Sequence, residues 1–185
     1  HVMPTYPLAA SLVVFQMGSL ALGQIPAHAT VLNPTTSLAD AIVLQDGDTV
    51  HALGRSGSSV LYARSRDGGR TWPVRESPIG PYNAGGRLAA AIGMPGTIMA
   101  LALDSNNGPT FWHSADDGTT WSPGIPLSNV GPPLADGSTA LCAEGLDVVA
   151  AWMPDGGTLS CRRSIDGGAS WLPEQLLSLA GTSNA

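Results

Sequence analysis

The chain has 185 residues, of which 12% are charged, and its net charge is −6. All eight basic residues are arginines and they form no long basic run, which argues against a nucleic-acid partner. Glycine (23 residues) and proline (15 residues) are spread between apolar runs, a distribution typical of a turn-rich β protein rather than a disordered chain.

Residues 1–29 differ from the rest of the chain and predict a signal-peptide helix. The segment Leu8–Gly23 is uncharged and mostly apolar, and Ala27-His28-Ala29 follows it as an Ala-x-Ala cleavage pattern. The apolar run is short for a membrane span, which needs about 20 residues; a membrane anchor is the alternative. We therefore expect cleavage after Ala29, a secreted or periplasmic location and no membrane contact after cleavage.

An octapeptide with the pattern Ser-x-Asp-x-Gly-x-(Thr/Ser)-Trp occurs three times. Its aspartates are Asp67, Asp116 and Asp166, so the copies are 49 and then 50 residues apart. A fixed period of this length indicates a repeat architecture. The residues that define the pattern are Ser65, Asp67, Gly69, Thr71 and Trp72, then Ser114, Asp116, Gly118, Thr120 and Trp121, then Ser164, Asp166, Gly168, Ser170 and Trp171.

The octapeptide predicts a structural turn rather than a catalytic site. Its glycine supplies positive φ, its aspartate can accept backbone N–H bonds within the turn, and its serine can brace that carboxylate. The tryptophan should begin the next strand and bury its indole against a neighbouring sheet. We expect the three aspartates to occupy equivalent turns on one rim of the molecule.

Apolar runs around the octapeptides predict four antiparallel strands per repeat with no helix between them. Such a repeat is typical of a β-propeller blade, with blades at about residues 36–79, 85–127 and 136–178. Tyr62, Phe111 and Cys161 each stand three residues before an octapeptide serine and should form one core column. The predicted strands are 38–44, 49–53, 59–64 and 72–77, then 87–92, 97–103, 110–113 and 121–127, then 138–143, 147–152, 158–163 and 171–177.

The spacing and sequence of the octapeptides resemble the Asp-box, or bacterial neuraminidase repeat, of the sialidase superfamily. The resemblance covers residues from about 36 to 178 and implies a six-bladed propeller. Residues 30–185 would then supply three blades, and the remaining blades would come from missing chain or from a second copy. An isolated half-propeller would expose unpaired sheet flanks, which proteins avoid.

The resemblance places a substrate site on the end of the propeller opposite the Asp-boxes. A glycan or a protein is the expected ligand there. The alternative reading of each candidate is a solvated turn residue. The candidate contacts are Arg55, Tyr82, Asn83, Arg87, Asp104, Asn106, Asn107, Asp136 and Asp155.

The resemblance also implies which catalytic groups a sialidase would need: three arginines on the substrate carboxylate, an aspartate acid/base and a Tyr–Glu nucleophile pair. Ser37-Leu38-Ala39 stands where the family has Arg-Ile-Pro, and no aspartate follows Gly54-Arg55 in the next loop. We therefore predict no catalytic residue and a non-catalytic glycan- or protein-binding propeller segment. The alternative is the N-terminal half of an exo-sialidase-type glycoside hydrolase whose other catalytic residues lie beyond Ala185.

Metals, cofactors and disulfides are not expected. His1, His28, His51 and His113 lack metal-ligand spacing, and Asp46-Gly47-Asp48 is better read as a hairpin turn than as a calcium loop. Cys142 and Cys161 should lie on strands separated by one other strand, about 9–10 Å apart. A disulfide needs Cα atoms within about 7 Å, so we predict two free, buried cysteines.

Overall fold

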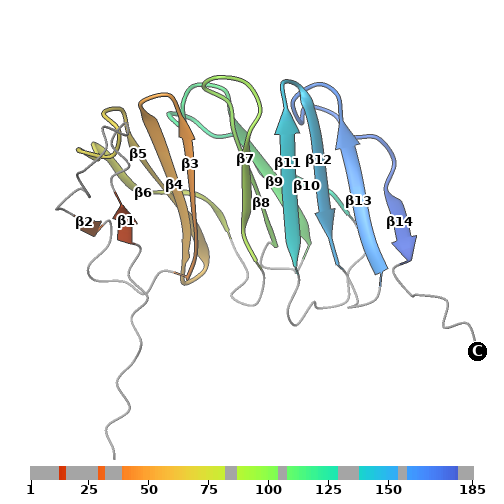
Figure 1. Ribbon diagram of the computed structural model, residues 1–185. Helices are drawn as coiled ribbons and strands as arrows, with labels where there is room; N and C mark the ends of the chain where they lie inside the picture. Colours follow the sequence, from red (N-terminus) through yellow and green to blue (C-terminus); the bar gives the residue numbers. More distant parts are fainter. Residues whose placement is uncertain are drawn as a thin grey trace, which may run out of the picture.

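The computed structural model describes residues 13–15, 29–31, 39–81, 87–103, 108–128, 138–153 and 158–178. These residues form three four-stranded antiparallel sheets and one two-stranded pair, and they contain no helix. The three sheets stand side by side as consecutive blades of a β-propeller (Figure 1). The predicted all-β propeller fold with three four-stranded blades is therefore confirmed.

Each blade is a simple meander in which neighbouring strands are consecutive in sequence. Blade 1 contains β3 (Ala39–Asp46), β4 (Thr49–Ser56), β5 (Ser59–Ser65) and β6 (Val74–Pro81). Blade 2 contains β7 (Ala89–Ile92), β8 (Ile98–Leu103), β9 (Pro109–Ser114) and β10 (Ile125–Pro126). Blade 3 contains β11 (Thr139–Glu144), β12 (Asp147–Trp152), β13 (Thr158–Ser164) and β14 (Gln175–Ser178).

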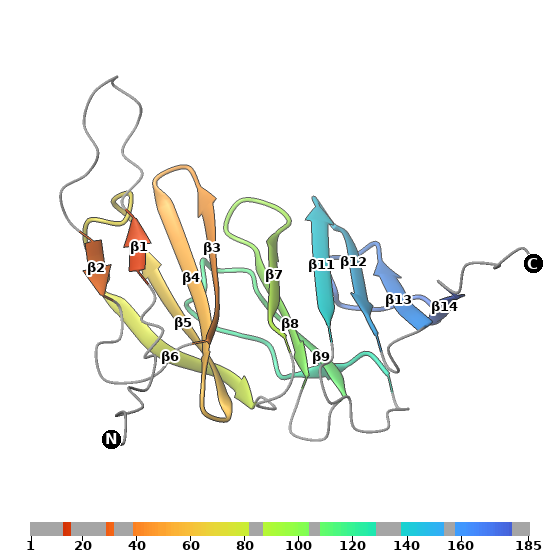
Figure 2. The same ribbon diagram turned by 60° about the horizontal axis from the view of Figure 1, so that its bottom comes forward.

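The predicted signal-peptide region is described only in part. Its strand β1 (Val13–Phe15) pairs antiparallel with β2 (Ala29–Val31), which begins at the last residue of the predicted signal peptide. Figures 1 and 2 place this pair beside blade 1, on the side away from blade 2. The rest of the predicted helix lies outside the described residues. None of the described ranges holds a helix long and apolar enough to cross a membrane.

The first strands of the blades, β3, β7 and β11, lie next to one another and point the same way (Figure 1). Their starts therefore share one end of the molecule, and the turns that follow them share the other. Backbone bonds tie the octapeptides to these turns, for example from the N–H of Gly68 to the carbonyl of Asp48 at 2.8 Å. The predicted separation of an octapeptide rim from an opposite end is therefore present in the structure.

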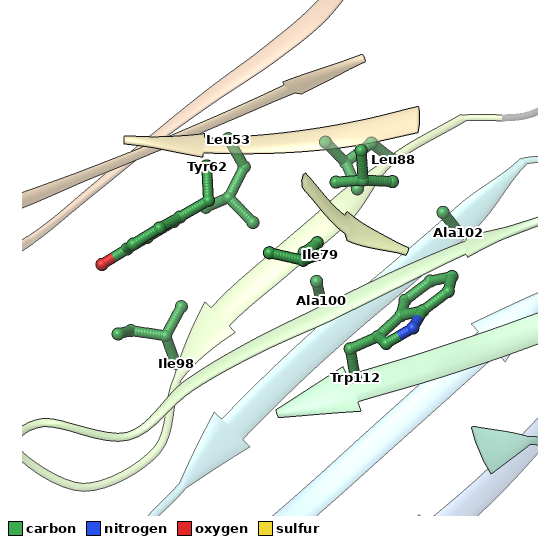
Figure 3. Close-up of a cluster of buried hydrophobic side chains, with 9 residues drawn as sticks. Leu53, Tyr62, Ile79, Leu88, Ile98, Ala100, Ala102 and Trp112 are labelled. Carbon is green, nitrogen blue, oxygen red and sulfur yellow. The ribbon is translucent and has the colours of Figure 1, made fainter. Parts of the chain in front are cut away.

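Apolar side chains between the blades form the core. One cluster fills the space between blades 1 and 2, with Leu53, Tyr62, Ile98 and Trp112 at its centre (Figure 3). A second cluster lies between blades 2 and 3 and includes Leu101. All six residues of β8 are buried because this strand is covered on both faces, as its apolar sequence predicts. Full burial of a side chain such as Leu53 contributes about 1.5–3 kcal/mol.

The predicted core column is present. Tyr62 pairs with Leu53, Phe111 with Leu101 and Cys161 with Ala151, so the three residues occupy the same register position in their blades. The octapeptide tryptophan of the following blade meets this column edge-on. The ring centroids are 5.2 Å apart for Tyr62 and Trp121 and 5.0 Å apart for Phe111 and Trp171. An octapeptide therefore joins its blade to the preceding one.

Two predictions about the strands and cysteines are wrong. The fourth strands begin at Val74, Ile125 and Gln175 rather than at the tryptophans, because a proline without an N–H follows within two residues of each tryptophan. Cys142 and Cys161 are free, as predicted, but Cys142 is exposed and Cys161 is only partly buried. Both lie on the face of blade 3 that points away from blade 2.

Candidate functional site

The octapeptide turns are closed networks of local hydrogen bonds. In the first turn, the Ser65 hydroxyl donates to Oδ1 of Asp67 at 2.7 Å, and the Thr71 N–H donates to the same oxygen at 2.8 Å. The Thr71 hydroxyl donates to Oδ2 at 2.6 Å. Asp116 and Asp166 accept the equivalent bonds in the other two turns. The predicted equivalence of the three aspartates is therefore found.

These hydrogen bonds hold the three carboxyl groups in the ionised form. Bonds from Thr120 lower the pKa of Asp116 to about 2, and bonds from Ser170 lower the pKa of Asp166 to about 2. Bonds from Thr71 lower the pKa of Asp67 in the same way. A general acid needs a pKa near the working pH, so these carboxylates are suited to holding turns rather than to catalysis.

A polar cluster joins blades 1 and 2 at the octapeptide end and was not predicted from the sequence. Arg64 donates from Nη1 to the carbonyl of Asp117 at 2.5 Å and to the Thr119 hydroxyl at 3.0 Å. The Tyr62 hydroxyl donates to the same carbonyl at 2.9 Å, and Nδ1 of His51 lies 2.8 Å from that hydroxyl. Burial lowers the pKa of His51 and raises the pKa of Tyr62. His51, Tyr62 and Arg64 are all buried, so this cluster is a joint rather than a ligand site.

The opposite end of the inner strands carries a second charged cluster, formed by Asp40, Arg55 and Arg87. Nε of Arg55 lies 3.0 Å from Oδ2 of Asp40, and Nη1 of Arg87 lies 4.0 Å from Oδ1 of Asp40. One carboxylate therefore stands between two guanidinium groups from different blades. The Arg87 side chain is 69% exposed, whereas those of Arg55 and Asp40 are 19% and 21% exposed.

The backbone holds Asp40 in an unusual conformation. Its φ is 50°, in the left-handed region that residues other than glycine rarely adopt. The pairing of β3 with β4 shifts register between Ala39 and Ile42, so a bulge surrounds this residue. Bulges commonly redirect a side chain near a functional site. Here the bulge accompanies the ion pair between Asp40 and Arg55.

The structure brings together two of the sequence-predicted contact residues. Arg55 lies on β4, not in a loop as predicted, because the hairpin turn is confined to Gly57 and Ser58. Arg87 lies just before β7, and its carbonyl accepts a hydrogen bond from the Thr139 hydroxyl of β11 at 2.9 Å. The other predicted contacts, Tyr82, Asn83, Asp104, Asn106, Asn107, Asp136 and Asp155, lie outside the described residues.

Asp40 was missed by sequence reasoning. Its one signal is a charged residue at the start of an otherwise apolar strand, Ala39 to Leu44. Together with the two arginines it offers several N–H donors and a carboxylate acceptor at one point. Such a combination can bind hydroxyl groups, which both donate and accept, and the arginines can also bind an anionic group.

No protein-family model matches the chain, and no curated protein matches it. Solved structures do. A six-bladed β-propeller lectin from Aleuria aurantia, described with a novel fucose recognition mode, matches with a TM-score of 0.57 and 15% identity, over 84% of this chain and 49% of the lectin. The NanB sialidase from Streptococcus pneumoniae matches with a TM-score of 0.56 and 16% identity, over 78% of this chain and 24% of the sialidase.

A third match is the Trypanosoma rangeli sialidase in complex with 2,3-difluorosialic acid. Its TM-score is 0.52 and its identity is 12%, over 92% of this chain and 36% of that enzyme. The chain thus spans about half the length of the lectin and less of the two sialidases. These similarities define the fold, a sialidase-like β-propeller, and at such identities they define nothing finer.

Proposed function

We propose that this chain is a segment of a secreted, non-catalytic, Asp-box propeller that binds a glycan at the end opposite the octapeptides. The observation that carries the proposal is the shared carboxylate of Asp40 between Arg55 and Arg87. Two blades contribute to it at the starts of the inner strands, so the arrangement depends on the assembled propeller.

The chemistry of the cluster favours a sugar ligand. A sugar presents adjacent hydroxyl groups, and each can accept from a guanidinium while donating to a carboxylate. Arg87 is largely exposed and can turn toward a ligand, whereas Arg55 and Asp40 are mostly buried and preorganised. A lectin and sialidases share this fold, which makes carbohydrate recognition compatible with the scaffold. A protein ligand remains the competing occupant.

A non-catalytic role is proposed because two elements that the resemblance to sialidases implies are missing from their expected places in the sequence. The three repeated carboxylates are saturated by hydrogen bonds within their own turns. Ser37-Leu38-Ala39 also replaces the arginine-bearing motif that a sialidase would have at the start of the first blade.

Binding can be tested on a glycan microarray and then by calorimetry with a methyl fucoside and a sialyllactose. We expect Arg87→Gln and Asp40→Asn to weaken binding of the positive glycan at least about tenfold, the value of one lost charge-assisted hydrogen bond. Arg66→Gln is the matched control, since Arg66 is also exposed and paired with an aspartate, Asp117, but at the octapeptide end. Equal losses in all three variants, or no glycan binding at all, would refute the proposed site.

Sialidase activity is the alternative function. Incubation of the chain with a fluorogenic sialoside separates the two, because a glycan-binding scaffold leaves the substrate intact. Release of fluorophore well above the background of a heat-treated sample would replace the binding proposal by the hydrolase.

Secretion forms part of the proposal and has its own test. Expression of the chain behind a start codon, in a host with a secretory pathway, should release protein beginning at Thr30, because Ala29 ends the Ala-x-Ala pattern. Amino-terminal sequencing of the released protein would reveal any other cleavage point.

A further inference from the structure

The face of blade 3 that points away from blade 2 is an open sheet face. It lies at one end of the row of blades in both views (Figures 1 and 2). Strand register places its residues on one side: Ala140, Cys142, Glu144, Asp147, Val149, Ala151, Leu159, Cys161, Arg163, Gln175 and Leu177. All are exposed or only partly buried, although seven of these eleven are apolar or cysteine. We call this set the open face.

The open face repeats a surface that is buried twice elsewhere in the molecule. Its positions Val149, Ala151 and Cys161 correspond by register to Met99, Leu101 and Phe111 of blade 2, which are fully buried against blade 3. In blade 1 the same positions are His51, Leu53 and Tyr62, buried against blade 2. The open face is therefore built as a contact between blades.

The structure shows what these positions contact in a complete joint. Tyr62 is covered by an octapeptide glycine of the next blade, Gly118. The two lie so close that a Cβ on Gly118 would be 2.1 Å from the Tyr62 ring. A Cβ on Gly168 would be 2.3 Å from the Phe111 ring. The octapeptide tryptophan of the next blade completes the contact. Cys161 occupies the third position of this column.

The arginine of the joint between blades 1 and 2 recurs in blade 3, whereas blade 2 has His113 at this position. Arg64 and Arg163 each immediately precede an octapeptide serine, and they occupy the same register position in blades 1 and 3. Arg64 donates to the carbonyl of Asp117 in the next blade. Arg163 instead pairs with the Asp147 carboxylate of its own blade and is 55% exposed. It is in position to reach an octapeptide carbonyl that a further blade would bring.

A second copy of the chain does not offer the complementary surface. That surface would be the outer face of blade 1, which carries Trp72 of the first octapeptide. In the uncleaved 185-residue chain, which also carries the β1–β2 pair beside blade 1 (Figure 1), this face is already buried: Val50 is 6% exposed, Ala52 2%, Ala63 5% and Trp72 3%. In the uncleaved chain, the outer face of the first blade is thus covered and that of the third is not.

We infer that the open face docks a fourth four-stranded blade that carries the same octapeptide and is supplied by polypeptide outside these 185 residues. The tryptophan and glycine of its octapeptide lie on Cys161, and one of its octapeptide carbonyls accepts a hydrogen bond from Arg163. This inference rests on the joints between the described blades and is independent of glycan binding.

A tandem chain tests the inference. A second copy of residues 87–128, which is blade 2, is added after Ala185. Residues 179–185 then connect it to blade 3; this connection is longer than residues 82–86, which connect blades 1 and 2, and shorter than residues 129–137, which connect blades 2 and 3. We expect the reaction of Cys142 and Cys161 with a thiol reagent to slow at least about tenfold, since reactivity follows exposure of the thiolate. The Tm of the tandem chain should also rise above that of the parent.

Two variants separate docking from mere attachment. Trp121→Arg in the added copy alone should restore the reactivity of both thiols, because it removes the indole from the joint. Cys161→Phe copies Phe111 and should raise the Tm of the tandem chain but not of the parent, with Cys142 as the remaining thiol probe.

Three outcomes would overturn the inference. One is a folded, protease-resistant added blade that leaves both thiols as reactive as in the parent. Another is a parent chain that doubles its mass and protects its thiols as concentration rises, which would make a second copy the occupant. The third is failure of the face to hold either added blade 2 or, in a repeat, added residues 138–178.

Discussion

The Tyr62 hydroxyl donates a hydrogen bond across 2.9 Å to the carbonyl of Asp117 and so joins the core of blade 1 to the octapeptide of blade 2. Since the hydroxyl proton goes to Asp117, the neutral His51 ring carries its proton on Nδ1 and donates it to the Tyr62 oxygen. Asp117 itself has a φ of 58° at a position where the other two octapeptides have glycine. The bonds from Tyr62 and Arg64 therefore hold a strained turn in place.

Removal of the Tyr62 hydroxyl tests the value of this joint. Tyr62→Phe should lower the free energy of unfolding by about 1–2 kcal/mol, because the buried His51 nitrogen loses its partner. Phenylalanine fits the column, since Phe111 occupies the same register position in blade 2. Urea unfolding followed by tryptophan fluorescence measures the change, and an unchanged midpoint would show that the bond adds no stability.

The octapeptide glycines allow a matched pair of substitutions. Gly69 and Gly118 have φ values of 88° and 72°, so alanine is strained at both, by about 1 kcal/mol or more. A Cβ on Gly118 also meets the Tyr62 ring at 2.1 Å, whereas on Gly69 the nearest atom is 3.8 Å away on Trp72. Gly118→Ala should therefore cost about 1–3 kcal/mol more than Gly69→Ala. Equal unfolding midpoints would contradict this account of the joint.

His51 predicts a pH dependence near neutrality. Burial lowers its pKa below the ordinary 6.5, so the folded state prefers the neutral ring. The contribution of neutral His51 to the free energy of unfolding is present above about pH 6.5. It is lost as the pH falls toward the folded-state pKa, because the unfolded chain then binds a proton that the folded chain does not. His51→Met, which copies Met99 of blade 2, should flatten the Tm between pH 7 and pH 5. A wild-type Tm that is constant over this range would contradict the prediction.

The octapeptide carboxylates predict a separate acid transition. The pKa of Asp116 is about 2 in the folded state against 3.8 for the free side chain, so its stabilisation is present above about pH 4 and is lost as the pH falls toward 2. Asp116→Asn should be less stable than the wild type at pH 7 and should lose less stability between pH 5 and pH 2. Glu174→Gln, at an exposed residue outside the turns, serves as the control for the removal of one carboxylate.

The octapeptide turn was predictable from the sequence because its hydrogen bonds join residues that are close together in the chain. Each octapeptide satisfies its aspartate with a serine two residues before and a hydroxyl residue four residues after. Its turn and its repetition could therefore be inferred. The strand order also followed from the repeat. The starts of the fourth strands did not follow from the repeat. The tryptophans pack between blades, and the prolines after them lack the N–H that strand pairing needs, so each fourth strand begins later.

The candidate site was predictable only in part. Arg55 and Arg87 were expected at this end, but their common partner Asp40 was not, since nothing in the sequence shows the bulge that redirects it. The joint of Tyr62 with Asp117 was missed because its partners are 55 residues apart.

By itself, the sequence determined the blades: a period of about 50 residues, four strands per repeat and a turn closed by its own side chains. Only the tertiary structure decided which residues meet between blades. Tyr62 and Phe111 are buried because a following octapeptide covers them, while Cys161, in the same register position, stays partly exposed. Burial of these side chains depends on whether another sheet covers them, which the alternation of residues along a strand does not specify.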